Sequence, residues 1–276
     1  MSPYCYIDGQ VKKITQANLP VTDLAILRGF AVFDFARIYN QKPFYLKDHF
    51  TRFIKSARIL GLAVPISLID LEKIIKKLLQ KNKLVDASIK MVLTGGKTVD
   101  GISIQKNTSN FFILMDEQHH LPAGYFTTGT KLITYNHQRV LPRAKNSSYI
   151  PAVMLQAKKK KAGAVEILYL NNNLVLECTT SNIFLIKNKV LITPKDNILQ
   201  GITRKIVIAL ARRHKIKVEE REVSSAELFT TDEVFITATN KLVCPIVKID
   251  QTRINKGKVG DITFNLLESY RKLIAK

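Results

Sequence analysis

Apolar and polar positions in the first part of the chain alternate between helical and strand-like spacing. Phe50, Phe53 and Ala57 recur at helical intervals, so the pattern predicts a helix from Leu46 to about Leu60 with one face in the core. Period-two patterns, turn residues and a second helical stripe predict the other elements. These are a hairpin over 4–14, a helical turn over 23–28, a strand over 30–39, a helix over 67–79, and strands over 87–94 and 110–115.

The second half of the chain also alternates strands and helices, but its strands are shorter and more closely spaced. Asparagine- and lysine-rich segments at 171–173 and 187–189 are typical of turns. The strands are expected at 131–135, 165–170, 174–177, 183–186, 190–192, 217–222, 234–239 and 243–249, and the helices at 148–161, 202–214, 226–229 and 261–275. Many short antiparallel strands with helices between them indicate an α+β fold.

Between Asp116 and Gly129 the chain loses its hydrophobic period and contains Pro122 and two glycines, which is typical of a connection. We therefore expect an N-terminal α+β domain at 1–117, an interdomain connection at 118–129 and a C-terminal α+β domain at 130–276. His119 and His120 are adjacent in this segment. No nearby carboxylate or third ligand completes a site, so we expect no metal.

Composition places the chain among globular proteins with a substantial core, because 46% of its 276 residues are apolar. Cys5, Cys178 and Cys244 show neither paired nor metal-ligand spacing, which favours reduced thiols in a cytoplasmic protein. The N-terminus carries no secretory signal pattern, and no apolar run approaches the roughly 20 residues of a membrane span. We therefore expect no membrane partner.

The formal net charge of +21 raises the alternative of a nucleic-acid-binding protein. The lysines are spread over many elements, however, and no recognition motif or aromatic-basic interleaving accompanies them. The one dense run, Lys158 to Lys161, falls at the end of an expected helix, where cations complement the helix dipole. A specific nucleic-acid partner therefore remains a remote alternative.

Two motifs of the second half carry the chemistry. Glu177 ends an apolar run and is followed by four small polar residues, 178–181, and Asn182. The segment 199–204 then enters a helix, where we expect Gly201 to supply backbone freedom and Thr203 a hydroxyl beside the free amides of the first turn. Such a helix start binds phosphate. An acid beside a phosphate cradle indicates a phosphorylated heterocyclic cofactor whose ring nitrogen needs a counter-charge.

These motifs resemble the fold-type IV family of pyridoxal-phosphate enzymes, which includes branched-chain and D-amino-acid transaminases and aminodeoxychorismate lyase. The family pattern is an acid, small polar residues, Asn and an apolar-aromatic pair, followed by Leu-x-Gly-Ile-Thr-Arg, and every position is met here. The resemblance extends from about Gly9 to about Thr263. It implies a two-domain α+β fold with a barrel-like sheet, pyridoxal 5'-phosphate at the domain interface, and a homodimer.

The resemblance also implies roles for individual residues. Lys145 matches the Schiff-base lysine, which then acts as general base, although Ser148 stands where many members have Asn. Glu177 would keep the ring nitrogen protonated, and Arg52, within His49-x-x-Arg52, matches the phosphate arginine. Further cofactor contacts are expected from Tyr149, Thr180, Ser181, Asn182, Leu199, Gly201, Ile202, Thr203, Ala238 and Thr239.

The substrate is less determined. Branched-chain transaminases carry Tyr-x-Arg where this chain has Ser88 and Lys90, and D-amino-acid transaminases carry Thr-Arg-Gly where it has Thr94-Gly95-Gly96. The remaining candidates for holding substrate are Phe33, Arg28, Arg37, Lys90 and Lys241. Of the cations we favour Arg28, because it precedes Gly29 in a loop that the resemblance places near the active site. We expect an aminotransferase that moves an amino group between an amino acid, of branched-chain or D type, and a 2-keto acid. The alternative is an aminodeoxychorismate lyase that forms 4-aminobenzoate and pyruvate.

Overall fold

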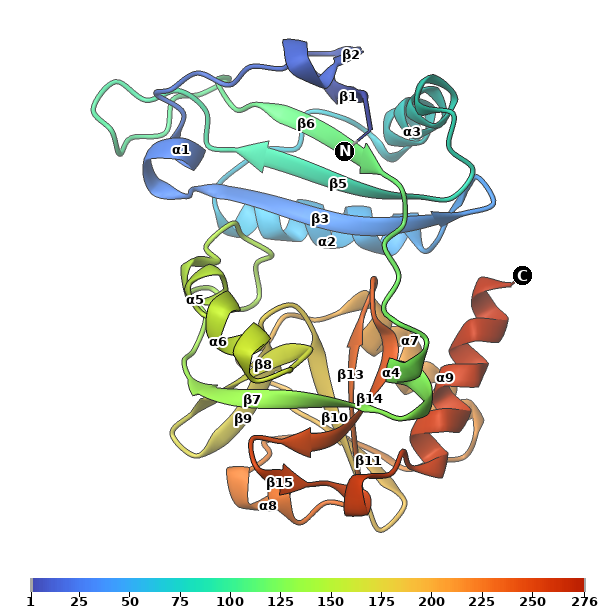
Figure 1. The fold of residues 1–276 in the computed structure, drawn as a ribbon. Coiled ribbons are helices and arrows are strands. Elements are labelled where there is room, and N and C mark those ends of the chain that lie inside the picture. Colours follow the sequence, from blue (N-terminus) through green and yellow to red (C-terminus); the bar gives the residue numbers. More distant parts are fainter. Residues whose placement is uncertain (1, 276) are drawn as a thin grey trace. The chain divides into compact units, whose positions relative to one another are not determined.

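The computed structural model describes residues 2–275, and the chain forms two compact units (Figure 1). The first unit runs to His119 and also includes Ala144–Ser148. The second comprises His120–Arg143 and the chain from Tyr149 onward. The expected connection at 118–129 contains this division. The expectation assigned 144–148 to the C-terminal domain, however, whereas the contacts of this segment lie in the first unit.

The first unit is an antiparallel sheet covered on one face by two helices. Its strand order is β2-β1-β6-β5-β3-β4. The strands are β1 (Tyr4–Ile7), β2 (Gln10–Lys13), β3 (Ala31–Tyr39), β4 (Lys42–Pro43), β5 (Ala87–Thr94) and β6 (Phe111–Asp116); the helices are η1 (Ile14–Gln16), α1 (Leu24–Arg28), α2 (Leu46–Ile59) and α3 (Leu68–Asn82). Val32, Ala36 and Ile38 alternate along β3 and pack with α2 and α3 in one core. Phe33 and Phe35 lie on the opposite face and are half-buried.

The segment 144–148 extends this sheet along the free edge of β3. The Phe33 amide donates to the Lys145 carbonyl at 2.9 Å, and the Ser147 amide donates to the Ala31 carbonyl at 2.9 Å. From the side of α2, the buried Ser56 hydroxyl accepts from the Lys145 amide at 3.0 Å. The backbone of Lys145 is therefore fixed from both sides by the first unit.

The second unit is built on a mixed, curled sheet of order β12-β11-β10-β13-β14-β7-β8-β9, with β15 paired to β14 (Figure 1). The strands are β7 (Thr130–Asn136), β8 (Glu166–Asn171), β9 (Leu174–Cys178), β10 (Asn182–Lys187), β11 (Val190–Thr193), β12 (Val218–Glu220), β13 (Glu233–Ala238), β14 (Leu242–Ile249) and β15 (Thr252–Arg253). The helices are α4 (Gly124–Thr127), α5 (Ile150–Met154), α6 (Gln156–Lys161), α7 (Ile202–Arg213), α8 (Ser225–Phe229), η2 (Asn255–Gly257) and α9 (Asp261–Ile274). The α+β class is confirmed.

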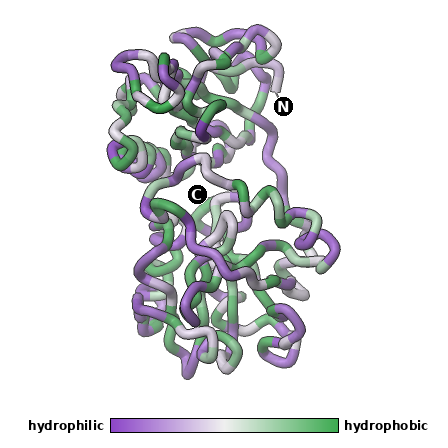
Figure 2. Tube along the Cα trace, turned by 90° about the vertical axis from the view of Figure 1, so that its left-hand side faces the viewer, coloured by the Kyte–Doolittle hydropathy of each residue, from purple (hydrophilic) through white to green (hydrophobic). Residues whose placement is uncertain are grey.

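Two details of the second unit differ from expectation. The sheet is not wholly antiparallel, because β7 runs parallel to both β8 and β14, and β11 runs parallel to β12. The single helix expected over 148–161 is wrong, since α5 and α6 are separate and Leu155 ends the first while preceding the second. In Figure 2, apolar segments run through the interior of each unit. None of the helices within residues 2–275 is long and apolar enough to cross a membrane.

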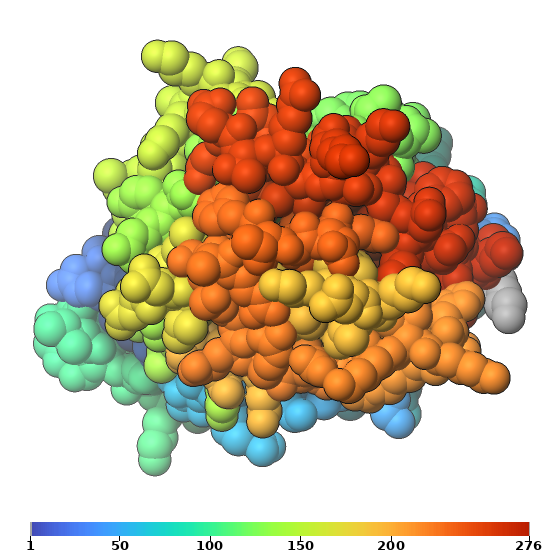
Figure 3. All heavy atoms as spheres, turned by 90° about the horizontal axis from the view of Figure 1, so that it is seen from below, coloured from blue at the N-terminus to red at the C-terminus, as the bar shows by residue number. Residues whose placement is uncertain are grey.

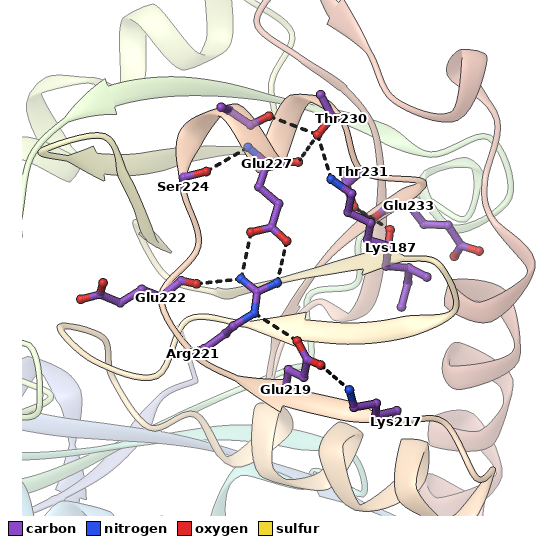
Figure 4. Close-up of polar contacts among 12 residues, drawn as sticks. Lys187, Lys217, Glu219, Arg221, Glu222, Ser224, Glu227, Thr230, Thr231 and Glu233 are labelled. Carbon is purple, nitrogen blue, oxygen red and sulfur yellow. Dashed lines mark hydrogen bonds and ion pairs between the residues drawn. The ribbon is translucent and has the colours of Figure 1, made fainter.

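The surface of the second unit seen in Figure 3 is formed largely by later parts of the chain, coloured yellow through orange to red. In these parts of the chain, Arg221 donates to both carboxylate oxygens of Glu227, at 2.6 and 2.8 Å, and to Glu219 at 3.1 Å (Figure 4). Lys217 pairs with Glu219 at 2.7 Å. These acids are neutralised locally and connect β12 to α8, so we regard the cluster as structural.

Candidate functional site

The acid of the first motif lies near the end of β9 and has two fixed donors. Glu177 is 4% exposed. Its Oε1 accepts from Nη1 of Arg139 at 2.9 Å, and its Oε2 accepts from the Leu199 amide at 3.0 Å. The guanidinium of Arg139 also lies 5.9 Å from the ring of Tyr149. Arg139 was not identified from the sequence, because nothing in its loop distinguishes it from the other basic residues.

The two motifs are joined directly through Asn182. Its Nδ2 donates to the Leu199 carbonyl at 2.8 Å. A Cβ at Gly201 would lie 2.1 Å from its Oδ1. Gly201 itself has φ −68° and ψ 141°, an ordinary extended conformation. The expectation that this glycine supplies backbone freedom is therefore wrong, since the close approach of Asn182 is what excludes a side chain.

The start of α7 fits an anion. No side chain caps this helix, and the first bond of its ladder runs from the Lys205 amide to the Gly201 carbonyl. The amides of Ile202 and Thr203 accordingly have no acceptor within the described chain. The pairing of Asn182 with Thr237 brings Ala238 at the end of β13, and Thr239 after it, to the same end of the sheet. Uncapped amides at the positive end of a helix dipole suit a phosphate.

The loop between β9 and β10 is anchored on a buried acid. Thr180 and Ser181 both donate their hydroxyls to Glu166, and Lys241 pairs with Glu166 at 2.8 Å. Burial alone would raise the pKa of Glu166, but Lys241 and the hydroxyl donors outweigh it and hold the pKa below its usual value. Glu166 is 2% exposed and Lys241 is 7% exposed. Lys241 is therefore committed to an internal ion pair, and the suggestion that it holds substrate is wrong.

In the first unit, the ring of Phe33, a residue expected to hold substrate, lies near the ammonium groups of both Lys145 and Lys90. Nζ of Lys145 lies 4.4 Å from the ring centroid of Phe33, and Nζ of Lys90 lies 5.9 Å from the same centroid. Because Phe35 pairs with Lys90 across β3 and β5, Lys90 projects from the sheet face that carries Phe33. Lys90 is exposed.

The other two substrate candidates are placed differently. Arg37 is 2% exposed and donates through Nη2 to the His119 carbonyl at 2.5 Å. Arg28 is exposed at the end of α1, and its Nη1 donates to the neighbouring Leu27 carbonyl at 2.8 Å. Of the candidate cations, Lys90 is therefore the one that offers an exposed ammonium on the sheet face of Phe33.

Arg52 occupies a buried polar cluster with Asp34 and His49. Its Nε and Nη2 donate to the two carboxylate oxygens of Asp34, each at 2.8 Å, and His49 Nδ1 lies 2.8 Å from the same carboxylate. From the sequence, Arg52 was identified as a phosphate ligand, but its contacts with Asp34 and His49 were not predicted. The period-two pattern of β3 could have found Asp34, because it puts this acid on the core face between Val32 and Ala36, where a charge needs a partner.

No group of three His, Cys, Asp or Glu side chains suited to a metal ion occurs among residues 2–275. The first unit carries a lysine and an arginine with free donors, and the second unit carries a paired acid and an uncapped helix start. These residues fit a phosphorylated aldehyde with a basic ring nitrogen.

Comparison with known proteins points the same way. Residues 31–249 match the family model "Amino-transferase class IV". The chain is 32% identical to a "Putative branched-chain-amino-acid aminotransferase" of Methanocaldococcus jannaschii, over 98% of this chain and 96% of that protein. It is 29% identical to a D-alanine aminotransferase of Staphylococcus epidermidis, over 98% and 97%.

Solved structures extend the comparison. A T.th. branched-chain amino acid aminotransferase, complexed with N-(5'-phosphopyridoxyl)-L-glutamate, superimposes with a TM-score of 0.89 at 26% identity, covering 99% of this chain and 94% of that one. A "Putative 4-amino-4-deoxychorismate lyase" from Legionella pneumophila has a TM-score of 0.84 at 27% identity, covering 95% and 97%.

Proposed function

Because the chain belongs to the amino-transferase class IV family, we propose that it moves the amino group of a branched-chain or D-amino acid to a 2-keto acid and works as a cytoplasmic homodimer. It is an aminotransferase that uses pyridoxal phosphate. The observation that carries the substrate proposal is full-length similarity to relatives named for both types of amino acid.

Each cofactor residue has a role that its surroundings support. Pyridoxal phosphate supplies an aldehyde that takes up the amino group and a ring that accepts electrons. Lys145 would bind the aldehyde and, once displaced by substrate, move the α-proton. Glu177, held by Arg139 and the Leu199 amide, would keep a proton at the ring nitrogen. The amides of Ile202 and Thr203 would bind the phosphate, with Arg52 as the cationic partner.

We propose Lys90 and Phe33 as the substrate-binding pair. Lys90 presents an exposed ammonium beside the ring that Lys145 also contacts, and no acid pairs with it among the described residues. A carboxylate of the amino acid would bind this ammonium while its side chain packs on Phe33. The structure favours Lys90 over Arg28, whose guanidinium turns back to its own helix.

The homodimer is supported by an apolar surface on α5. Ile150, Val153 and Met154, which stand at helical spacing on α5, are 69%, 69% and 75% exposed. Apolar residues gathered in this way typically mark a protein interface. Sedimentation of the wild type and of Val153→Glu would test the assignment, and a monomeric wild type would refute it.

Single-turnover absorbance tests the function. With a panel of L- and D-amino acids, an aminotransferase converts its cofactor to the amine form, and a 2-keto acid restores the starting spectrum. Borohydride reduction followed by peptide mapping should place the cofactor on Lys145. If no amino acid changes the spectrum while aminodeoxychorismate yields pyruvate and 4-aminobenzoate, the lyase is the correct activity. If the adduct maps to another lysine, the assignment of Lys145 is wrong.

A further inference from the structure

Helix α2 carries a polar stripe on a face that is otherwise apolar. His49, Arg52 and Ser56 stand three and four residues apart, so they share one side of the helix. Ser56 accepts from the Lys145 amide, whereas His49 and Arg52 contact Asp34. The same helix therefore touches the segment of the Schiff-base lysine and holds the arginine assigned to phosphate.

Asp34 is the group that fixes the arginine. It lies on β3 with an exposed fraction of 0%. Arg52 donates side-on to it through Nε and Nη2, both at 2.8 Å. This geometry uses one edge of the planar guanidinium and leaves both hydrogens of Nη1 and one of Nη2 on the other edges. Within the described chain, Nη1 of Arg52 has no acceptor.

The surrounding donors hold Asp34 ionised and immobile. Its Oδ1 also accepts from the Phe35 amide at 2.7 Å and from His49 Nδ1 at 2.8 Å. Burial would raise the pKa of Asp34, but Arg52 and His49 outweigh it and hold the pKa well below its usual value. Burial lowers the pKa of His49, so its imidazole is neutral near pH 7 and donates through Nδ1.

We propose that Asp34 is a positioning residue that orients Arg52 so that its remaining donors bind the cofactor phosphate. The inference rests on the proposed phosphate role of Arg52. The side-on pair with Asp34 fixes the plane of the guanidinium, so the remaining edge with Nη1 has one fixed orientation. Orientation matters because a guanidinium held in one geometry loses little side-chain entropy when it binds an anion.

The test separates phosphate binding from stability by comparing two ligands. Equilibrium binding of pyridoxal phosphate and of pyridoxal, which lacks the phosphate, gives an affinity ratio for each variant of the apoenzyme. We expect Asp34→Asn to lower this ratio about tenfold or more, because Arg52 would no longer be oriented to make its charge-assisted contact with the phosphate. Pyridoxal affinity should stay within about twofold. An unchanged ratio in Asp34→Asn overturns the proposal.

Two further variants make the result specific. His49→Asn keeps an amide donor for Asp34 and leaves the Arg52–Asp34 pair in place, so its ratio should fall much less than that of Asp34→Asn. Arg52→Met should lose the phosphate preference, and adding Asp34→Asn to it should have no further effect on the ratio. An equal loss in His49→Asn, or a further loss in the double variant, contradicts a role through Arg52.

The outcomes distinguish this proposal from the one on which it rests. If Arg52→Met keeps the wild-type ratio, Arg52 does not bind phosphate and both assignments fail. If Arg52→Met lowers the affinity ratio of pyridoxal phosphate to pyridoxal but Asp34→Asn leaves it at the wild-type value, only the positioning role of Asp34 fails. Should Asp34→Asn not fold, Asp34→Glu moves the carboxylate by one methylene group and should lower the ratio several-fold. An unchanged ratio there also overturns the proposal.

Discussion

Replacing Gly201 with alanine tests the junction between the two motifs of the second unit. The new Cβ would lie 2.1 Å from Oδ1 of Asn182, whereas ordinary contact begins at 3.4 Å, so the atoms must separate by about 1.3 Å. Asn182 is 5% exposed and belongs to β10, which pairs with β13. Its backbone is therefore restrained, and the side chain must rotate or the start of α7 must move.

Either response carries a calculable penalty. Rotation of Asn182 breaks its 2.8 Å bond to the Leu199 carbonyl, which costs about 1–3 kcal/mol for a buried group. Overpacking of a buried site adds about 1–3 kcal/mol. We expect Gly201→Ala to lose about 2–6 kcal/mol of unfolding free energy. Because Ile202 and Thr203 follow directly, cofactor affinity should fall as well.

Denaturant unfolding followed by circular dichroism measures the effect, since the chain has no tryptophan. Gly124→Ala is the matched control, because a Cβ there meets nothing within 4 Å and the glycine begins a helix. In a double-mutant cycle, Asn182→Ala removes the colliding atom, so the double variant should be about as stable as Asn182→Ala alone. If Gly201→Ala is as stable as Gly124→Ala, the close approach does not explain the glycine.

The buried acids give three further predictions. Glu177→Gln should keep its cofactor absorbance but lose about a hundredfold in kcat/KM, and unchanged turnover would remove the acid from the mechanism. Because the folded pKa of Asp34 is depressed, its contribution to stability is complete above the reference pKa of 3.8 and is lost as pH falls further. The stability gap between wild type and Asp34→Asn should therefore narrow below that pH, and a constant gap in acid titrations would contradict it. Lys241→Met leaves Glu166 buried without its cation and should cost about 3–5 kcal/mol in denaturant unfolding, largely recovered by adding Glu166→Gln; equal stabilities of the two variants would refute the pairing.

The elements with strong local signals were predictable from the sequence. The strand at 87–94 is β5, and the helix expected over 202–214 is α7 at Ile202–Arg213. The helix expected over 148–161 is divided at Leu155, because the polar run after this residue does not continue the apolar stripe. The assignment of 144–148 to the first unit was not predictable, since backbone pairing with β3 uses no side-chain pattern.

Site residues were predictable from the sequence where they belong to a recognisable motif. Glu177 and Lys145 were found through their motifs, but Arg139 was not, because a loop arginine in so basic a chain carries no signal. Asp34 and Glu166 show a different case. Each is an acid inside an apolar strand, and both prove to be buried and paired with a cation. An acid at a core position of a strand therefore predicts a buried cation that pairs with it. The sequence does not identify which lysine or arginine that cation is.

The net charge of +21 is the excess of 43 lysines and arginines over 22 aspartates and glutamates. Asp34, Glu166 and Glu177 are buried and each compensates one internal cation. The surface acids around Arg221 are also paired. These acids do not pair with exposed lysines such as Lys158–Lys161 at the end of α6. The four lysines complement the negative end of the helix dipole. Because each of these ion pairs is neutral, the excess positive charge lies on the remaining lysines and arginines, and the field it creates favours the approach of carboxylate and phosphate ligands.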